Sequence, residues 1–183
     1  MPGYSKGLLL LLIALTVFSC KPDPENKDNP VNASDGVFNQ DLDKKNGLDK
    51  IQLPAGFSIS VFAQVPNARS LCLTRNGTVF AGNREEDKVY AITDVDKNGR
   101  AERLYTIAKN LNMPCGVAFR NGSLYVAEVN RILRFDDIEN RLNNPPQPVV
   151  VFDKYPEDGH HGWKYIALCC SGGKNYLLGI SPY

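Results

Sequence analysis

The hydrophobic residues form one apolar block near the N-terminus and many short runs from residue 51 onward. Residues 8–17 are continuously apolar apart from a threonine, whereas residues 21–50 are rich in Pro, Asn, Asp and Lys. Beyond residue 51, short runs of Val, Ile, Leu, Tyr and Phe alternate with turns containing Gly, Asn, Asp or Pro. Helical periodicity is slight, so the pattern predicts an all-β fold of short strands. One or two helical turns are expected at residues 136–142, ahead of a Pro-Pro pair.

Two segments of the β-rich region resemble each other at an offset of 45 residues. The sequence RNGTVFA at 75–81 is echoed by RNGSLYV at 120–126, and the flanking runs match as well. An Asn-Gly pair between apolar runs predicts a β-hairpin turn at 76–77 and again at 121–122. A repeat of about 45 residues with several strands is typical of one β-propeller blade. Residues 51–183 leave room for about three blades, the third starting near residue 149. A single β-sandwich with accidental similarity is the alternative.

The N-terminus has the features of a targeting segment. Lys6 precedes the apolar residues, which are too few to span a bilayer comfortably, and Ser19-Cys20 follows them. This order predicts a lipoprotein signal peptide at 1–19, with Cys20 acylated and the mature chain held on the outer side of a bacterial membrane, periplasmic or at the cell surface. An ordinary signal peptide with a chance cysteine is the alternative. Residues 20–50 are predicted to form a flexible linker, because they hold too little apolar surface to fold, and residues 51–183 form the β domain.

Composition and charge exclude several classes of function. With 21 Lys+Arg against 20 Asp+Glu, no basic face for nucleic acid is expected. Hydrophobic residues at 43% and charged residues at 22% are typical of a folded domain. No phosphate loop, dinucleotide-binding glycine pattern or nucleophile elbow is present.

Two motifs are candidates for chemistry. His160 and His161, the only histidines, lie in a polar loop before a strand that begins near Lys164, and either serve as general bases or are structural. Asp94, Asp96 and Asn98 have the spacing of a calcium loop, with Glu102 at its ninth position. The twelfth position is a tyrosine, where a calcium loop needs a glutamate, so a hydrogen-bonded turn is the alternative.

Several stretches together resemble one family, the PQQ-dependent glucose/sorbosone dehydrogenases, in particular the sorbosone dehydrogenase-like quinoproteins. They are Leu53–Phe57, Asp87–Ala91, Asn112–Phe119, Leu124–Val129 and His160–Lys164. The resemblance implies a six-bladed β-propeller, of which this chain is an N-terminal part. It also implies the oxidation of a sugar or sugar aldehyde by hydride transfer to pyrroloquinoline quinone (PQQ), with calcium polarising the quinone.

The resemblance also assigns roles to residues. His161 corresponds to the catalytic general base, while His160, Trp163 and Lys164 correspond to the rim that faces cofactor or substrate. In the family, the side chains that clamp PQQ and the carbonyls that hold calcium lie further downstream. After Leu168 the sequence departs from the family pattern, so an interrupted chain with impaired activity is expected. The alternatives are a non-catalytic cell-surface propeller that binds a partner, or an inactive gene fragment. The residues do not specify the sugar or the electron acceptor.

Overall fold

The computed structural model describes residues 31–32, 41–157, 162–171 and 174–180. Their regular secondary structure is mostly antiparallel β-sheet, which confirms the all-β prediction. The first sheet is a meander of β2 (Ala68–Leu73), β3 (Val79–Asn83), β4 (Val89–Thr93) and β5 (Arg103–Ala108). The short β1 (Val31–Asn32) pairs with β5 at its edge.

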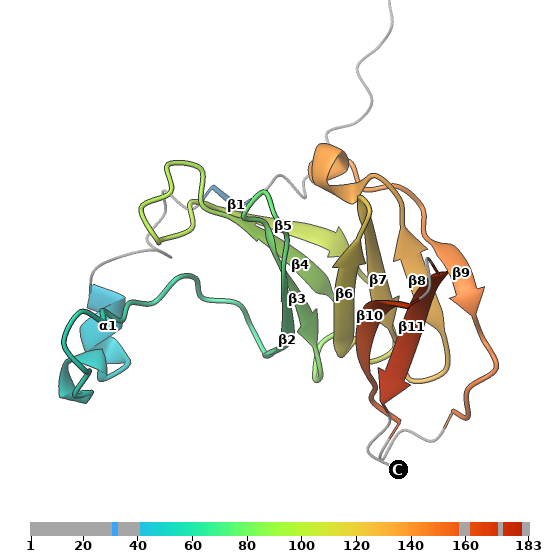
Figure 1. The fold of residues 1–183 in the computed structure, drawn as a ribbon, viewed down its shortest axis with the longest axis horizontal. Helices are drawn as coiled ribbons and strands as arrows, with labels where there is room; N and C mark the ends of the chain where they lie inside the picture. The colour runs from blue at the N-terminus through green and yellow to red at the C-terminus, as the bar shows by residue number, and fades with distance from the viewer. Residues whose placement is uncertain (1–30, 33–40, 158–161, 172–173, 181–183) are drawn as a thin grey trace, which may run out of the picture.

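The second sheet repeats this order with β6 (Gly116–Arg120), β7 (Ser123–Ala127), β8 (Ile132–Phe135) and β9 (Val149–Phe152). A two-stranded hairpin of β10 (Tyr165–Ser171) and β11 (Lys174–Ile180) follows. Figure 1 shows the first and second sheets next to each other, with the β10–β11 hairpin drawn over the second sheet.

The units pack face to face through two hydrophobic clusters. The larger cluster joins the first sheet to the second and includes Phe80, Tyr105, Leu124 and Phe135, all almost fully buried. The other joins the far face of the second sheet to β10, through residues such as Ile166. The second sheet is therefore covered on both faces, which explains why its strands do not alternate regularly between apolar and polar residues.

The first strands of the three units approach one another closely, with β2 beside β6 and β6 beside β10. The Ser70 hydroxyl joins two of them, since it donates to the Cys115 carbonyl and accepts from the Val117 N–H at 3.2 Å. Glycine is required at positions 82 and 116, because a Cβ on Gly82 or Gly116 would overlap a backbone carbonyl of the next unit. Among the described residues, no comparable packing joins the fourth strands, β5 and β9.

The two predicted Asn-Gly turns have different outcomes. Asn121-Gly122 is a two-residue hairpin turn between β6 and β7, and both residues have positive φ as a type I′ turn requires. The first turn is longer, because β2 ends at residue 73 and β3 begins at residue 79. Its shape is set by Thr74, whose hydroxyl accepts the Thr78 N–H and donates to Glu139 at 2.6 Å. A contact with Glu139, which lies between β8 and β9, thus takes part in this turn, and the Asn76-Gly77 pair does not form a two-residue hairpin turn.

The prediction that a third unit starts near residue 149 is wrong. Residues 149–152 form β9, which pairs with β8 and completes the second sheet. The third unit begins instead at β10. The error arose because an apolar run shows that a strand exists but not which strand it pairs with. The helical turn expected at 136–142 is present as η3 (Ile138–Arg141).

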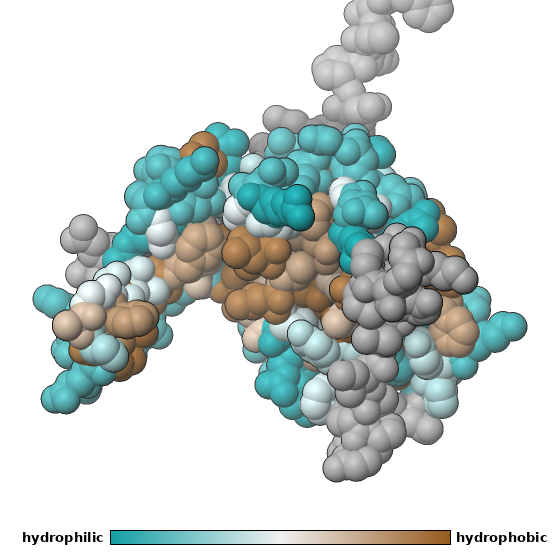
Figure 2. Space-filling view, in the orientation of Figure 1, coloured by the Kyte–Doolittle hydropathy of each residue, from teal (hydrophilic) through white to brown (hydrophobic). Residues whose placement is uncertain are grey.

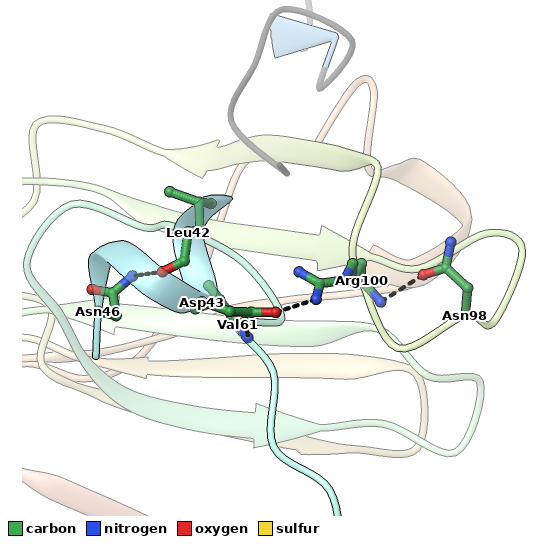
Figure 3. A network of polar contacts seen from close by, with 6 residues as sticks. All are labelled: Leu42, Asp43, Asn46, Val61, Asn98 and Arg100. Carbon is green, nitrogen blue, oxygen red and sulfur yellow. Dashed lines mark hydrogen bonds and ion pairs between the residues drawn. The ribbon is translucent and has the colours of Figure 1, made fainter. Parts of the chain in front are cut away.

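An N-terminal arm precedes the first sheet. It contains α1 (Asp41–Lys45) and η2 (Leu48–Lys50), both within the stretch predicted as a linker, followed by residues 51–60, which are all exposed. Asp43 anchors the arm, since its carboxylate accepts the Val61 N–H at 2.8 Å and pairs with Arg100 in the β4–β5 loop (Figure 3). The following residues 62–65 then pack on the open face of the first sheet.

The close approach of the first strands can be tested with Gly116→Ala. The new methyl group would overlap the carbonyl oxygen of Lys164, just before β10. This oxygen belongs to the backbone, so it cannot move aside as a flexible side chain would. We expect the free energy of unfolding to fall by about 3 kcal/mol in urea denaturation. Gly99→Ala is the control, because its site is open and only its positive φ is strained, at about 1 kcal/mol. Equal losses in the two variants would contradict the packing described.

The anchor of the arm should depend on pH. Hydrogen bonds from Arg100 and from the Val61 N–H hold the pKa of Asp43 below its usual range. The contacts of the Asp43 carboxylate therefore stabilise the folded arm fully above the usual aspartate pKa. This stabilisation is lost as pH falls through the lowered pKa of Asp43. We expect the protection of the Val61 amide from hydrogen exchange, relative to its intrinsic rate at each pH, to fall in that acid range. Asp43→Asn should show fast exchange already at pH 7, whereas Asp49→Asn, at an exposed site in η2, should behave like the parent chain.

Candidate functional site

The candidate site lies at the edge of the molecule where β2, β6 and β10 begin, which we call the converging end. Because neighbouring strands are antiparallel, the ends of β3 and β7 lie at this edge as well. Arg69 comes from the start of β2, Arg84 from the residue after β3, and Trp163 from the approach to β10. Residues distant in the sequence therefore meet at this end.

Trp163 is the centre of the arrangement. The guanidinium carbons of Arg69 and Arg84 lie 5.4 Å and 5.6 Å from the centroid of its ring. At this distance the negative face of the indole attracts each cation, by about 0.5–1 kcal/mol at an exposed site. Both arginines are exposed to solvent, while Trp163 is half-buried. The geometry thus presents two positive charges on one aromatic platform.

A cavity of about 360 Å³ adjoins this platform. It is lined by Arg69, Ser70, Leu71, Cys115 and Trp163–Tyr165. Cys115 is almost fully buried, and this burial raises the pKa of its thiol, an effect that the charges of Arg69 and Arg84 partly oppose. A thiol in this state is not a nucleophile at neutral pH, so Cys115 contributes shape and packing rather than chemistry.

Lys164, predicted as a rim residue, is buried with 5% of its surface exposed. Its ammonium group donates to the carbonyl of Val129 and, at 2.8 Å, to that of Gly162. The same group lies 4.6 Å from the centroid of the Tyr155 ring. Burial lowers the pKa of Lys164. The side chain thus ties the segment before β10 to the end of the second sheet, and its charge is engaged within the protein.

Two other buried polar residues secure loops at the converging end. Asn83 donates its side-chain amide to the Pro66 carbonyl at 2.8 Å. Glu128, fully buried, accepts the Asn112 N–H at 2.6 Å and pairs with Arg131. Each residue stands at or just after the end of the second strand of its sheet, and each holds the loop that leads into that sheet. The backbone at this end is therefore fixed by side chains.

The predicted catalytic residues His160 and His161 lie outside the described residues. Gly162, Trp163 and Lys164 follow them directly in the chain. Of the predicted rim residues, Trp163 and Lys164 both line the cavity, and the ammonium group of Lys164 is bonded within the protein. Arg69 and Arg84 were not predicted as site residues, although their places at the start of one strand and the end of the next could have indicated them.

The calcium-loop candidate lies at the opposite edge of the first sheet, in the β4–β5 connection. The carboxylates of Asp94, Asp96 and Glu102 offer oxygen atoms within 4.8 Å of one another. The side-chain oxygen of Asn98, the third predicted ligand residue of the loop, accepts the Arg100 N–H at 2.8 Å. Asp94 accepts the backbone N–H groups of Asn98 and Gly99. These hydrogen bonds are those of a polar turn, so Asp94 has a structural role there without a bound ion.

The predicted acylation site Cys20 and the predicted signal peptide also lie outside the described residues. Within the part of the chain that the structure describes, no helix is long and apolar enough to span a membrane.

Comparisons with known proteins give one distant similarity. No family model matches the sequence, and no solved structure matches the chain. An uncharacterized protein of Borreliella burgdorferi is 25% identical over 95 residues, which are 51% of this chain and 23% of that protein. The chain therefore spans less than a quarter of the length of this relative.

The role of Lys164 can be tested with Lys164→Met, which keeps a similar shape but removes the ammonium group. The buried carbonyls of Val129 and Gly162 would lose their shared donor, at a cost of about 1–3 kcal/mol in unfolding free energy. The emission of Trp163 should shift as the adjoining segment loosens. Lys154→Met, at an exposed site, is the control and should leave both measurements unchanged. An unaltered melting temperature in Lys164→Met would contradict this role.

Proposed function

We propose that the sheets are successive blades of a β-propeller. Support comes from their wedge-like packing, in which the first strands are in contact and the fourth strands are not. The second sheet is covered on both faces, as a blade is, whereas a sheet of a two-layer sandwich would be covered on one. The 45-residue repeat also runs through all four strands, since β5 and β9 occupy corresponding places.

The proposed activity is PQQ-dependent oxidation of a sugar or sugar aldehyde, with His161 as general base. One observation carries this proposal: Trp163, two residues after His161, lies at the converging end beside a cavity and two exposed arginines. In a propeller, this edge of the first strands surrounds the mouth of the central channel. A histidine there is suited to accept the proton of a sugar hydroxyl, because its ordinary pKa is near neutrality.

PQQ supplies the acceptor for the hydride when it is bound. The described residues do not by themselves form a complete site for it. The converging end offers two exposed guanidinium groups, whereas PQQ carries three carboxylates. A calcium ion beside the quinone does not fit the described residues either. Their one cluster of three carboxylates, at Asp94, Asp96 and Glu102, lies at the opposite edge of the sheet. The proposal for this chain therefore concerns proton transfer and substrate binding.

The proposed location is the outer side of a bacterial membrane, through acylation of Cys20. The exposed arm of residues 51–60 supports this, because an extended segment suits a connection between a lipid anchor and a folded domain. Labelling with a radioactive fatty acid, compared with Cys20→Ala, would reveal the anchor.

The activity can be tested by adding PQQ, Ca²⁺ and a dye acceptor to the full chain and measuring sugar-dependent dye reduction. His161→Ala should lower the rate by about 100-fold or more, because it removes the general base. His160→Ala is the matched control and should retain most of the activity. Calorimetry with PQQ then separates the alternatives. Absence of both heat and dye reduction would refute the proposal and favour a non-catalytic binding propeller or an inactive fragment.

A further inference from the structure

The two arginines at the converging end carry charge that no described carboxylate neutralises. Ion pairs among the described residues involve Arg100, Arg131 and Arg134, and neither Arg69 nor Arg84 takes part in one. Glu86, two residues after Arg84, accepts hydrogen bonds from Asn67 and from the Tyr90 hydroxyl. Two guanidinium groups held on one indole ring repel each other, so an anion placed between them would be bound favourably.

The shape of the adjoining cavity limits the size of that anion. At about 360 Å³ it is near the lower limit of ligand pockets, which suits a monosaccharide better than a larger cofactor. Its lining combines apolar surface from Leu71 and Trp163 with the exposed Tyr165, a combination that suits a sugar ring. Arg69 lines the cavity and Arg84 lies on the Trp163 ring beside it, where a guanidinium group can bind both oxygens of a carboxylate.

We infer that Arg69 and Arg84, held on Trp163, bind the carboxylate of a sugar acid whose ring occupies the adjoining cavity. The inference deepens the proposed function, on which its assignment of the ligand as a substrate rests, by naming the substrate class as an acidic sugar. Arg69 and Arg84 act here as binding residues, and no bond is made or broken by them.

The chain contains its own reporter, because Trp163 is its single tryptophan. Titration of the full chain with glucuronate should change Trp163 emission in a saturable manner, and added NaCl should weaken the binding. Glucose, which lacks the carboxylate, should cause no such change. Glucose 6-phosphate tests whether the site prefers a phosphate, and PQQ tests whether it belongs to the cofactor.

The variants Arg69→Gln and Arg84→Gln should each weaken glucuronate binding by about tenfold or more. Arg141→Gln, which removes an exposed arginine of η3 at the opposite edge, is the matched control and should bind as the parent does. Should a glutamine variant fail to fold, Arg69→Lys and Arg84→Lys keep the charge but lose the two-pronged contact, and they should bind with intermediate affinity.

Four outcomes would overturn the inference. They are an equal response to glucose and glucuronate, no response to either, glucuronate binding unaltered by the glutamine variants, and a preference for glucose 6-phosphate or PQQ over glucuronate. The experiment needs no bound quinone and no turnover. Glucuronate binding without dye reduction would therefore refute the proposed oxidation and support the binding site. Dye reduction that occurs with neutral sugars but not with glucuronate would support the oxidation and refute the binding site.

Discussion

The arrangement of the molecule depends on how closely the beginnings of β2, β6 and β10 approach one another. Gly82 and Gly116 allow this approach because neither places a Cβ against the neighbouring carbonyls. Ser70 then makes use of it, with one hydroxyl satisfying a carbonyl and an N–H of the next sheet. If the strands were further apart, the cores on the two faces of the second sheet would open to water.

The same approach creates the candidate site. Arg69, Arg84 and Trp163 come from three different parts of the chain, and they meet only because the sheets that carry them converge at one edge. The arginines tolerate each other because both are exposed, and water screens their repulsion. An anion that displaced this water would strengthen its attraction to both guanidinium groups. The positive charge of the site is thus a consequence of the packing of the sheets rather than of a local motif.

Local signals in the sequence were reliable where no distant contact competed with them. Asn121-Gly122 forms the predicted turn, whereas Asn76-Gly77 lies in a longer turn that Glu139 of η3 contacts. The partner of residues 149–152 was unpredictable for a related reason, since an apolar strand pairs equally well as a first or a last strand.

The candidate site was predictable only in part. Trp163 was assigned to the rim through the family resemblance of the segment His160–Lys164. The positions of Arg69 and Arg84 follow from the antiparallel order of the strands, and their stacking follows from tertiary packing that no short motif encodes. The helical turns at residues 41–50 arose in a polar stretch, where Asp43 gains a partner, Arg100, that lies far along the chain.

The two edges of the sheets differ in a way that bears on where a ligand binds. At the converging end, Asn83, Glu128 and Lys164 are buried polar residues whose hydrogen bonds fix the surrounding loops. Burying such groups is costly unless they are fully bonded, so this edge is held in a defined shape. At the opposite edge, the residues of the β4–β5 turn are mostly exposed and bond chiefly within that turn. A ligand site needs side chains held in place before the ligand arrives, and the converging end meets that requirement.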